Sequence, residues 1–457
     1  MALGKRPQQR QAPLFVATAD LPRSAGHVFY RKLNQLLAEA GFDEWVERLC
    51  QPFYAEAMGR PGIPPGIYFR MLLVGYFEGI GSQRGIAWRC GDSLSLREFL
   101  GVPLDQDSPD HSSLTNTRNR LPQEVHAAVF TWVLRLAEEK RLLCGKAVGV
   151  DSTTLEANAA MKSIVCRDTG EDWRAYLKRL MQGAGLLDDE DEPPSDDQLR
   201  RFDKSRTDKK VGNAEWTSPT DPDSRIAKMK SGETHLAYKA EHVVDLDTNL
   251  IVAAEIYHAD QADAHTLEDS VQQAQTNVRE CGSEKQLVAV VADKGYHSAA
   301  GIAALREQTP YRAYIAEPAA PHGRRWTDKS PEQQDAVYAN RRRNRGEHGR
   351  KLQRWRSERV ERTFAHVCET GGARRTWLWG IEKVRKRYAI AAAAHNLGLL
   401  MRKLFKMGTP RGLQAEGGFA PLAYLALLAL LQSLLRRIQA VLTLSTLANR
   451  PLAPDVA

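Results

Sequence analysis

The chain has 457 residues, a length that allows about two or three domains and a substantial core. Hydrophobic residues make up 42% of it and charged residues 26%, which is ordinary for a soluble globular protein. The formal net charge of +8 favours a polyanionic partner such as nucleic acid, although an excess of lysine and arginine is weak evidence alone.

The cysteines and the apolar segments indicate a protein of the reducing cytoplasm. The six cysteines are scattered without a Cys-x-x-Cys pair, which argues against a disulfide framework or a zinc ribbon. The N-terminus lacks the apolar core of a signal peptide, and the apolar run at residues 421–431 is too short to span a bilayer. We therefore expect a cytoplasmic protein without a membrane partner.

Residues 1–26 are predicted to form a flexible basic arm, and residues 27–145 an all-α domain with apolar residues at helical spacing. A helix at residues 66–78 should stop at Gly79, and Ser82 is a plausible N-cap of a second short helix that carries Arg84. This order of helix, glycine turn and helix is that of a DNA-binding helix-turn-helix. A helical hairpin that only packs within an all-α domain, without binding DNA, is more common. A second candidate DNA-binding surface is residues 110–120, with Arg118 and Arg120.

A short β-branched run at residues 146–150 ends on Asp151, and the small hydroxyl residues after it indicate a turn. On this stretch alone, a turn-forming cap explains Asp151 better than a metal ligand does. Residues 161–234 show little periodicity and are expected to be an insertion, part helix at 173–181 and part irregular loop.

Regular alternation resumes in a β-hairpin at residues 237–257, followed by a helix at 264–280 and an apolar strand at 287–292. Another helix at 298–307 and a strand at 312–316 come next, and the chain is then mostly helical and very basic to residue 406. This order predicts an α/β domain with a mixed sheet at residues 146–406. Residues 407–457 should form a linker and an apolar helix at 422–447, covered by the protein body or by a second subunit.

Asp293 ends its strand much as Asp151 ends the first, and such acids converge at the carboxyl edge of an α/β sheet. A third acid is expected from a helix packed across that edge. Glu361 lies beside the buried stripe of that helix, whereas Glu358 lies closer to its polar side. Three carboxylates would repel one another unless cations bridge them, and hard oxygen ligands suit Mg²⁺ or Mn²⁺. Two such ions, roughly 4 Å apart, can activate water and stabilise a leaving 3′ oxygen.

Seven segments carry a resemblance to a known family: residues 59–61, 109–114, 149–159, 218–228, 235–242, 292–296 (Ala-Asp-Lys-Gly-Tyr) and 360–364 (Val-Glu-Arg-Thr-Phe). By these segments the chain resembles, over roughly residues 27–404, the DDE transposases of bacterial insertion sequences, which have an RNase H-like catalytic domain. In that family one Asp follows the first strand, a second follows the fourth, and a Glu lies on a later helix; the resemblance maps them onto Asp151, Asp293 and Glu361. The Tyr, Arg and Lys that some branches place around this Glu are replaced by Arg354, Ser357 and Cys368.

The resemblance implies a transposase that binds the element ends, cleaves the DNA and transfers the strands. Double-stranded DNA is the expected partner, a homodimer on DNA the expected assembly, and the bacterial nucleoid the expected location. Trp377 and Trp379 could stack on bases or pack in the core with equal probability. The candidate DNA-binding residues are Arg84, Arg118, Arg120, Lys294, Arg359, Arg362, Arg374, Arg375, Lys383 and Arg387.

Three alternatives stay open at this point. The chain could be a catalytically silent DNA-binding derivative, or an RNase H-like nuclease without strand transfer. The His- and Asp-rich stretch at residues 258–265 could be a metal site, but Asp260 or Asp263 is more simply explained as a helix cap.

Overall fold

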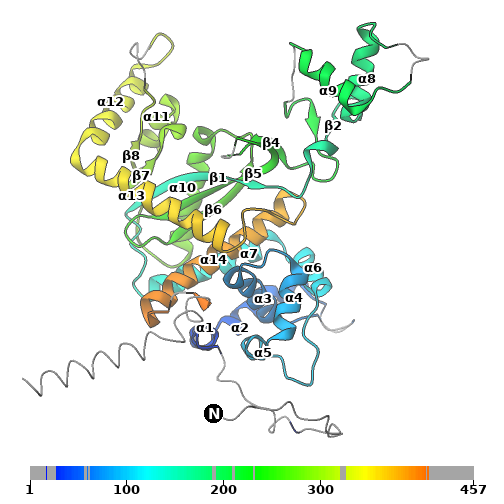
Figure 1. Cartoon of the computed structure of the whole chain (residues 1–457). Coiled ribbons are helices and arrows are strands. Elements are labelled where there is room, and N and C mark those ends of the chain that lie inside the picture. Colours follow the sequence, from blue (N-terminus) through cyan, green and yellow to red (C-terminus); the bar gives the residue numbers. More distant parts are fainter. Residues whose placement is uncertain are drawn as a thin grey trace, which may run out of the picture. The chain divides into compact units, whose positions relative to one another are not determined.

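The computed structural model describes residues 17, 27–55, 59, 62–187, 192–207, 212–229, 232–319, 326–407 and 409–410 (Figure 1). The chain divides into two units, Met1–Lys406 and Met407–Ala457, and nearly all described residues belong to the first. The predicted arm at residues 1–26, apart from residue 17, and the predicted apolar helix at 422–447 lie outside the described residues. No helix among the described residues combines the length and apolarity needed to cross a membrane.

The N-terminal part is all-α, as its apolar periodicity predicts. Helix α3 starts on a proline and ends at Gly79, whose φ of 67° gives the left-handed geometry that glycine adopts most easily. Ser82 then caps α4 by accepting a hydrogen bond from the backbone N–H of Gly85 at 3.1 Å. The helices are α1 (Val28–Glu39), α2 (Phe42–Cys50), η2 (Gln51–Phe53), α3 (Pro65–Glu78), α4 (Gln83–Asp92), α5 (Leu94–Leu100), α6 (His111–Arg120) and α7 (Gln123–Glu139).

A six-stranded mixed sheet forms the centre of the remaining chain. Strand β5 is antiparallel to β1 and to β6, while β7 and β8 run parallel to β1, which gives the order β6-β5-β1-β7-β8. Strand β4 pairs with the first residues of β5, beyond the end of β6. The strands are β1 (Ala147–Glu156), β4 (Arg225–Lys228), β5 (Thr234–Asp245), β6 (Ile251–His258), β7 (Ala289–Ala292) and β8 (Arg312–Ile315).

The structure corrects the predicted end of the first strand. The hydroxyl residues Ser152, Thr153 and Thr154 do not form a turn, because β1 continues through them to Glu156. Strand β5 is long enough to pair with β1 over this whole stretch, from Val148 to Glu156. The β-branched threonines suit this extended backbone. Asp151 therefore lies inside a strand and is no turn cap.

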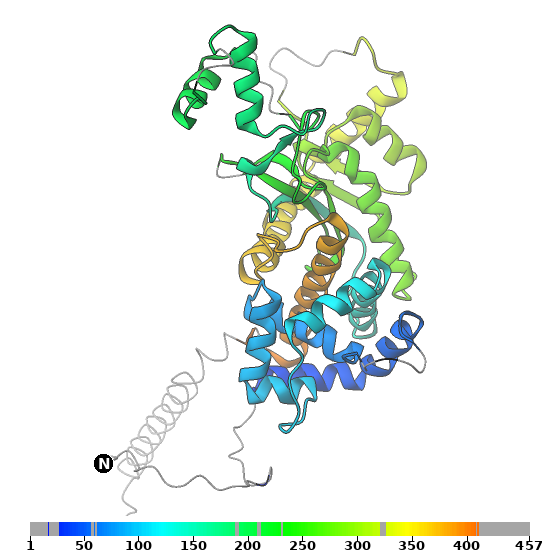
Figure 2. The same ribbon diagram turned by 90° about the vertical axis from the view of Figure 1, so that its right-hand side faces the viewer.

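Helices cover both faces of the sheet (Figure 1, Figure 2). On one face, α13 packs so closely on Gly149 that a Cβ there would lie 2.9 Å from Val360 Cγ2. On the other face, α10 packs against β5 and β6. Helix α14 contacts α7, α3 and β6, and it lies on the α13 side of the sheet, where His242 of β5 bonds both Thr363 of α13 and Tyr388 of α14. Asn396 of α14 bonds both backbone groups of Ile251, at 2.9 and 2.8 Å. These helices are α10 (Asp263–Glu280), η4 (Lys294–Tyr296), α11 (Ala299–Gln308), α12 (Pro331–Arg345), α13 (Glu347–Phe364), the π-helical turn η5 (Ala365–Thr370) and α14 (Ile381–Phe405).

The low-periodicity stretch at residues 161–234 is part helix and part loop, as predicted. Helix α8 (Trp173–Gly183) covers the predicted helix at 173–181. Helix α9 (Asp196–Ser205) was not predicted, although Ser195 and Gln198 form a capping box at its start. Residues 188–191, the core of the acidic run, lie outside the described residues. The remaining elements are η3 (Met161–Ser163) and the short strands β2 (Val165–Cys166) and β3 (Trp216–Thr217).

Candidate active site

The sheet brings Asp151 and Asp293 to neighbouring strands. Strands β1 and β7 are parallel, with Gly149 opposite Val291; Asp151 lies two residues beyond Gly149 within β1, and Asp293 lies directly after the end of β7. Because side chains alternate along a strand, the Asp151 carboxylate lies on the face that Gly149 presents to α13, where it contacts Arg356. The buried valines Val148 and Val150 point to the opposite face and fix this orientation.

Each aspartate is held by local contacts. Asp151 Oδ1 accepts a hydrogen bond from the backbone N–H of Ser152 at 2.9 Å, and its Oδ2 accepts one from Arg356 Nη1 of α13 at 2.8 Å. Asp293 Oδ1 accepts from the backbone N–H of Gly295 at 2.8 Å, so it caps η4. Both carboxylates are half-buried, and Arg356 already places a positive charge against Asp151.

The third predicted acid, Glu361, is exposed on α13, one residue beyond Val360, which packs on Gly149. The helix is fixed here by a 2.8 Å hydrogen bond between His242 Nδ1 and Thr363 Oγ1. The ligand atoms of Asp151, Asp293 and Glu361 do not all lie within 4.8 Å of one another. Among the described residues, the group that meets this spacing is Cys144, Asp245 and Asp247. Glu358 forms an exposed ion pair with Arg362 at 2.7 Å.

A buried ionic network lies behind the two aspartates, on the α10 face of the sheet. Lys239 Nζ contacts Asp263 Oδ1 at 2.9 Å and Glu241 Oε2 at 3.5 Å. Ser152 Oγ also donates to Asp263 Oδ1, at 2.9 Å. Tyr296 donates its hydroxyl hydrogen to Glu241 Oε2 at 2.9 Å. The network thus joins the residue after Asp151 to the turn after Asp293.

This network corrects the predicted role of Asp263. The N-cap of α10 is Ala262, and Asp263 is the first helical residue, with its carboxylate turned to Ser152 and Lys239. Asp260 lies 3.5 Å from Arg225 and caps no helix either. Sequence reasoning missed Lys239 altogether. The available signal was a pair of opposite charges two residues apart, Lys239 and Glu241, on one face of a predicted strand.

Burial sets the charge state of the network. Glu241 is fully buried, which raises the pKa of its carboxyl, while the neighbouring Lys239 lowers it. One oxygen of this carboxylate, Oε1, is buried without a hydrogen-bond partner. Burial and the nearby Glu241 raise the pKa of Tyr296 well above its ordinary value. Tyr296 therefore stays a neutral hydrogen-bond donor.

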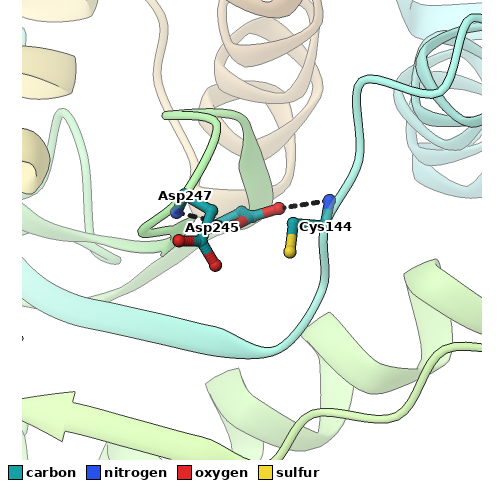
Figure 3. A group of neighbouring side chains, drawn as sticks. All are labelled: Cys144, Asp245 and Asp247. Atoms are coloured by element: carbon teal, nitrogen blue, oxygen red, sulfur yellow. Dashed lines mark hydrogen bonds between the residues drawn. The ribbon is translucent and has the colours of Figure 1, made fainter.

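A second acidic cluster consists of Cys144, Asp245 and Asp247, whose ligand atoms lie within 4.8 Å of one another (Figure 3). Backbone hydrogen bonds already occupy the buried Asp245 carboxylate. It accepts from the N–H groups of Cys144 at 2.7 Å, Gly145 at 3.0 Å and Asp247 at 2.9 Å. These bonds tie the β5–β6 turn to the start of β1, which explains the cluster without an ion.

Asp245→Ala should therefore destabilise the fold by about 3 kcal/mol, because three amides lose their acceptor. Urea unfolding measures this loss, and the exposed Asp247→Ala is the control, expected to stay within about 0.5 kcal/mol of wild type. A chelator that lowers the melting temperature of wild type, but not of Asp247→Ala, would instead identify an ion site.

The structure divides the ten predicted DNA-binding residues by exposure. Arg118 is only 5% exposed, and burial lowers its pKa. Arg387 donates to the carbonyl oxygens of Gly372 and Arg375, and burial lowers its pKa to about 10. Both guanidinium groups are structural. Exposed side chains belong to Arg84, Arg120, Lys294, Arg362, Arg375 and Lys383.

Two of the predicted residues lie between these extremes. Arg359 is half-buried, with its guanidinium 4.1 Å from the ring centre of Trp355. Arg374 reaches β1, where it donates to Thr153 Oγ1 at 3.0 Å, and also pairs with Glu369. Trp377 and Trp379 are 51% and 52% exposed, so neither is a core residue.

Comparisons with known proteins agree with this arrangement. The family model described as "Transposase domain (DUF772)" matches residues 18–120, and the model described as "Transposase DDE domain" matches residues 317–401. Glu361 lies within the second match, whereas Asp151 and Asp293 lie between the two. No curated protein and no solved structure matches the chain. These two matches, in the order seen along the chain, support a DDE transposase of the insertion-sequence type.

Proposed function

We propose that this transposase binds the ends of its element, cleaves the DNA strands with the help of divalent metal ions, and joins the freed 3′ ends to target DNA. The observation that carries the proposal is that β1, which contains Asp151, runs parallel to and beside β7, which Asp293 directly follows. The carboxyl edge of an α/β sheet is where such folds place their sites.

The sheet supports an RNase H-like catalytic domain over residues 146–406. Along the chain its main strands are β1, β5, β6, β7 and β8. Asp151 belongs to the first of these and Asp293 follows the fourth, and a later helix, α13, packs beside them with Glu361. This is the order expected from the resemblance to the family. The helical region at residues 27–145, with α4 following the α3 turn, is the proposed DNA-binding domain.

The donor set of the site fits Mg²⁺ or Mn²⁺. Asp151 and Asp293 offer half-buried carboxylate oxygens, the ligand type that these hard cations prefer. Arg356 against Asp151 marks a position where positive charge is stabilised. A pair of bound ions would supply an activated water and charge stabilisation for the leaving 3′ oxygen. Glu361, exposed on the adjoining helix, is the proposed third ligand.

The chain's own residues have three roles in this proposal. Ser152 and Arg356 orient the Asp151 carboxylate, and Gly295 orients that of Asp293. The network around Lys239 fixes the two acid-bearing segments relative to each other. The exposed cations then bind backbone phosphates of double-stranded DNA, and a homodimer would hold two element ends. Those cations are Arg84, Arg120, Lys294, Arg362, Arg375 and Lys383.

An assay on the full-length protein tests this function. The substrate is a labelled duplex that carries the terminal sequence of the element, taken from the DNA that flanks the gene. We expect Mg²⁺-dependent nicks at the element end and a joined product with a target plasmid, both lost with chelator. Cleavage without a joined product would favour a nuclease that lacks strand transfer. DNA binding without cleavage would favour a catalytically silent derivative.

A further inference from the structure

An open pocket of about 700 Å³ lies at the carboxyl end of β8, beside the candidate active site. Its lining comes from the end of β8, including Glu317, and from the joint between α12 and α13. Three arginines of this joint, Arg341, Arg345 and Arg350, line the pocket. Arg345 and Arg350 were not among the predicted DNA-binding residues.

The wall of the pocket is fixed by buried amide hydrogen bonds. Asn340, only 1% exposed, bonds both backbone groups of Ile315, at 2.9 and 2.8 Å. Gln353 Nε2 of α13 donates to the carbonyl oxygens of Tyr314 at 2.6 Å and Ala292 at 3.2 Å. Ala292 directly precedes Asp293, so the pocket wall touches the strand that carries this acid. The shape of the pocket therefore exists before any ligand binds.

The pocket carries two unbalanced positive charges. Its one lining carboxylate, Glu317, is matched by Arg341 through two bonds of 2.7 Å. Arg345 and Arg350 are exposed, and neither forms an ion pair with any residue that the structure describes. Arg350 Nε donates to the backbone carbonyl oxygen of Arg345 at 3.0 Å, which ties the start of α13 to the end of α12.

We propose that this pocket binds phosphate groups of the DNA backbone and holds the strand that passes the Asp151 and Asp293 pair. The proposal rests on the proposed function, since it assigns part of the same DNA substrate to a second site. The planar guanidinium group bonds two phosphate oxygens at once, and two arginines that have no ion-pair partner among the described residues suit a phosphodiester. The neighbouring Lys294, exposed just after Asp293, extends this positive surface toward the acids.

The test measures how the affinity for DNA depends on salt. The probe is a fluorescein-labelled duplex of about 30 base pairs, bound by the full-length protein between about 50 and 200 mM salt. Losing two phosphate contacts in the double variant Arg345→Gln/Arg350→Gln should reduce the slope of log K against log salt by about 2. The matched control, Arg312→Gln/Arg342→Gln, removes two exposed arginines that do not line the pocket and should leave the slope unchanged.

The outcomes separate this inference from the proposed function. An unchanged slope in the pocket variant, or an equal reduction in the control, would overturn the phosphate site. Thermal melting of both double variants at the wild-type temperature ensures that the comparison concerns folded protein. Asp293→Asn serves as the independent arm. If it kept wild-type cleavage, the proposed function would fail whatever the slope shows.

Discussion

Replacing Asp151 or Asp293 with asparagine is expected to lower the rate of Mg²⁺-dependent DNA cleavage by about a thousandfold or more. Asparagine keeps the size of the side chain but removes the charge that binds a divalent cation, and the loss amounts to several kcal/mol of transition-state stabilisation. DNA binding should persist, because the phosphate contacts come from other residues. Single-turnover cleavage of an end-labelled duplex measures the rate, and fluorescence anisotropy measures the binding.

The matched control is Asp247→Asn, which removes one exposed carboxylate from Cys144, Asp245 and Asp247, the group with metal-ligand spacing among the described residues. Its cleavage rate should equal that of wild type. Loss of cleavage in Asp247→Asn together with normal cleavage in Asp151→Asn would place the metal at Cys144, Asp245 and Asp247. That result would contradict the assignment of Asp151 as a metal ligand.

Lys239→Met is expected to destabilise the protein by about 3 to 5 kcal/mol at neutral pH, because it leaves the buried Glu241 carboxylate without its cation. Methionine retains the length of the side chain, so the effect on packing is small. Since the same network positions Ser152 and the turn after Asp293, cleavage should also fall, by about 10- to 100-fold. Urea unfolding and the cleavage assay measure the two effects.

This loss of stability should shrink in acid. The pKa of Glu241 is already raised by burial, and removal of Lys239 raises it further. The folded state then binds the proton more tightly than the unfolded state, whose glutamate titrates near 4.3, so stability falls as pH rises from that value through the folded pKa. Unfolding at about pH 5 should therefore show a smaller deficit than at about pH 7.5.

Lys285→Met is the control for this prediction, since Lys285 pairs with Glu138 at 2.7 Å and is 38% exposed. Its deficit should be smaller, because both partners of this pair are partly exposed to solvent. A deficit in Lys239→Met that stays constant with pH would show that Glu241 does not carry the effect.

The sequence predicted those parts of the fold that depend on local alternation and local turns. The hairpin, the helix from about residue 264 and the strand before Asp293 follow from apolar periodicity, and the structure has them within two residues at each end except at the start of β5. That the strands associated with Asp151 and Asp293 are neighbours followed from a general property of parallel strands. The length of β1 did not, because it depends on pairing with β5, which lies about eighty residues further along the chain.

Side-chain environments were harder to predict than elements. Arg118 and Arg120 are two residues apart on α6, so they face different sides of the helix, and only Arg120 is exposed. Lys239 and Asp263 meet only after β5 and α10 pack together. The orientation of Glu361 depends on how α13 is rotated about its axis when it packs on the sheet. The apolar stripe of the helix predicted only that Glu361 lies between its buried and polar sides.

The most direct test of the account is a change of metal preference at Asp293. Magnesium binds thiolates poorly, whereas softer cations such as Mn²⁺ accept them more readily. In Asp293→Cys, we expect DNA cleavage to be lost with Mg²⁺ and regained with Mn²⁺, while Asp247→Cys behaves like wild type with both ions. Equal cleavage by Asp293→Cys with Mg²⁺ and with Mn²⁺, at the wild-type rate, would contradict the assignment of this residue as a metal ligand.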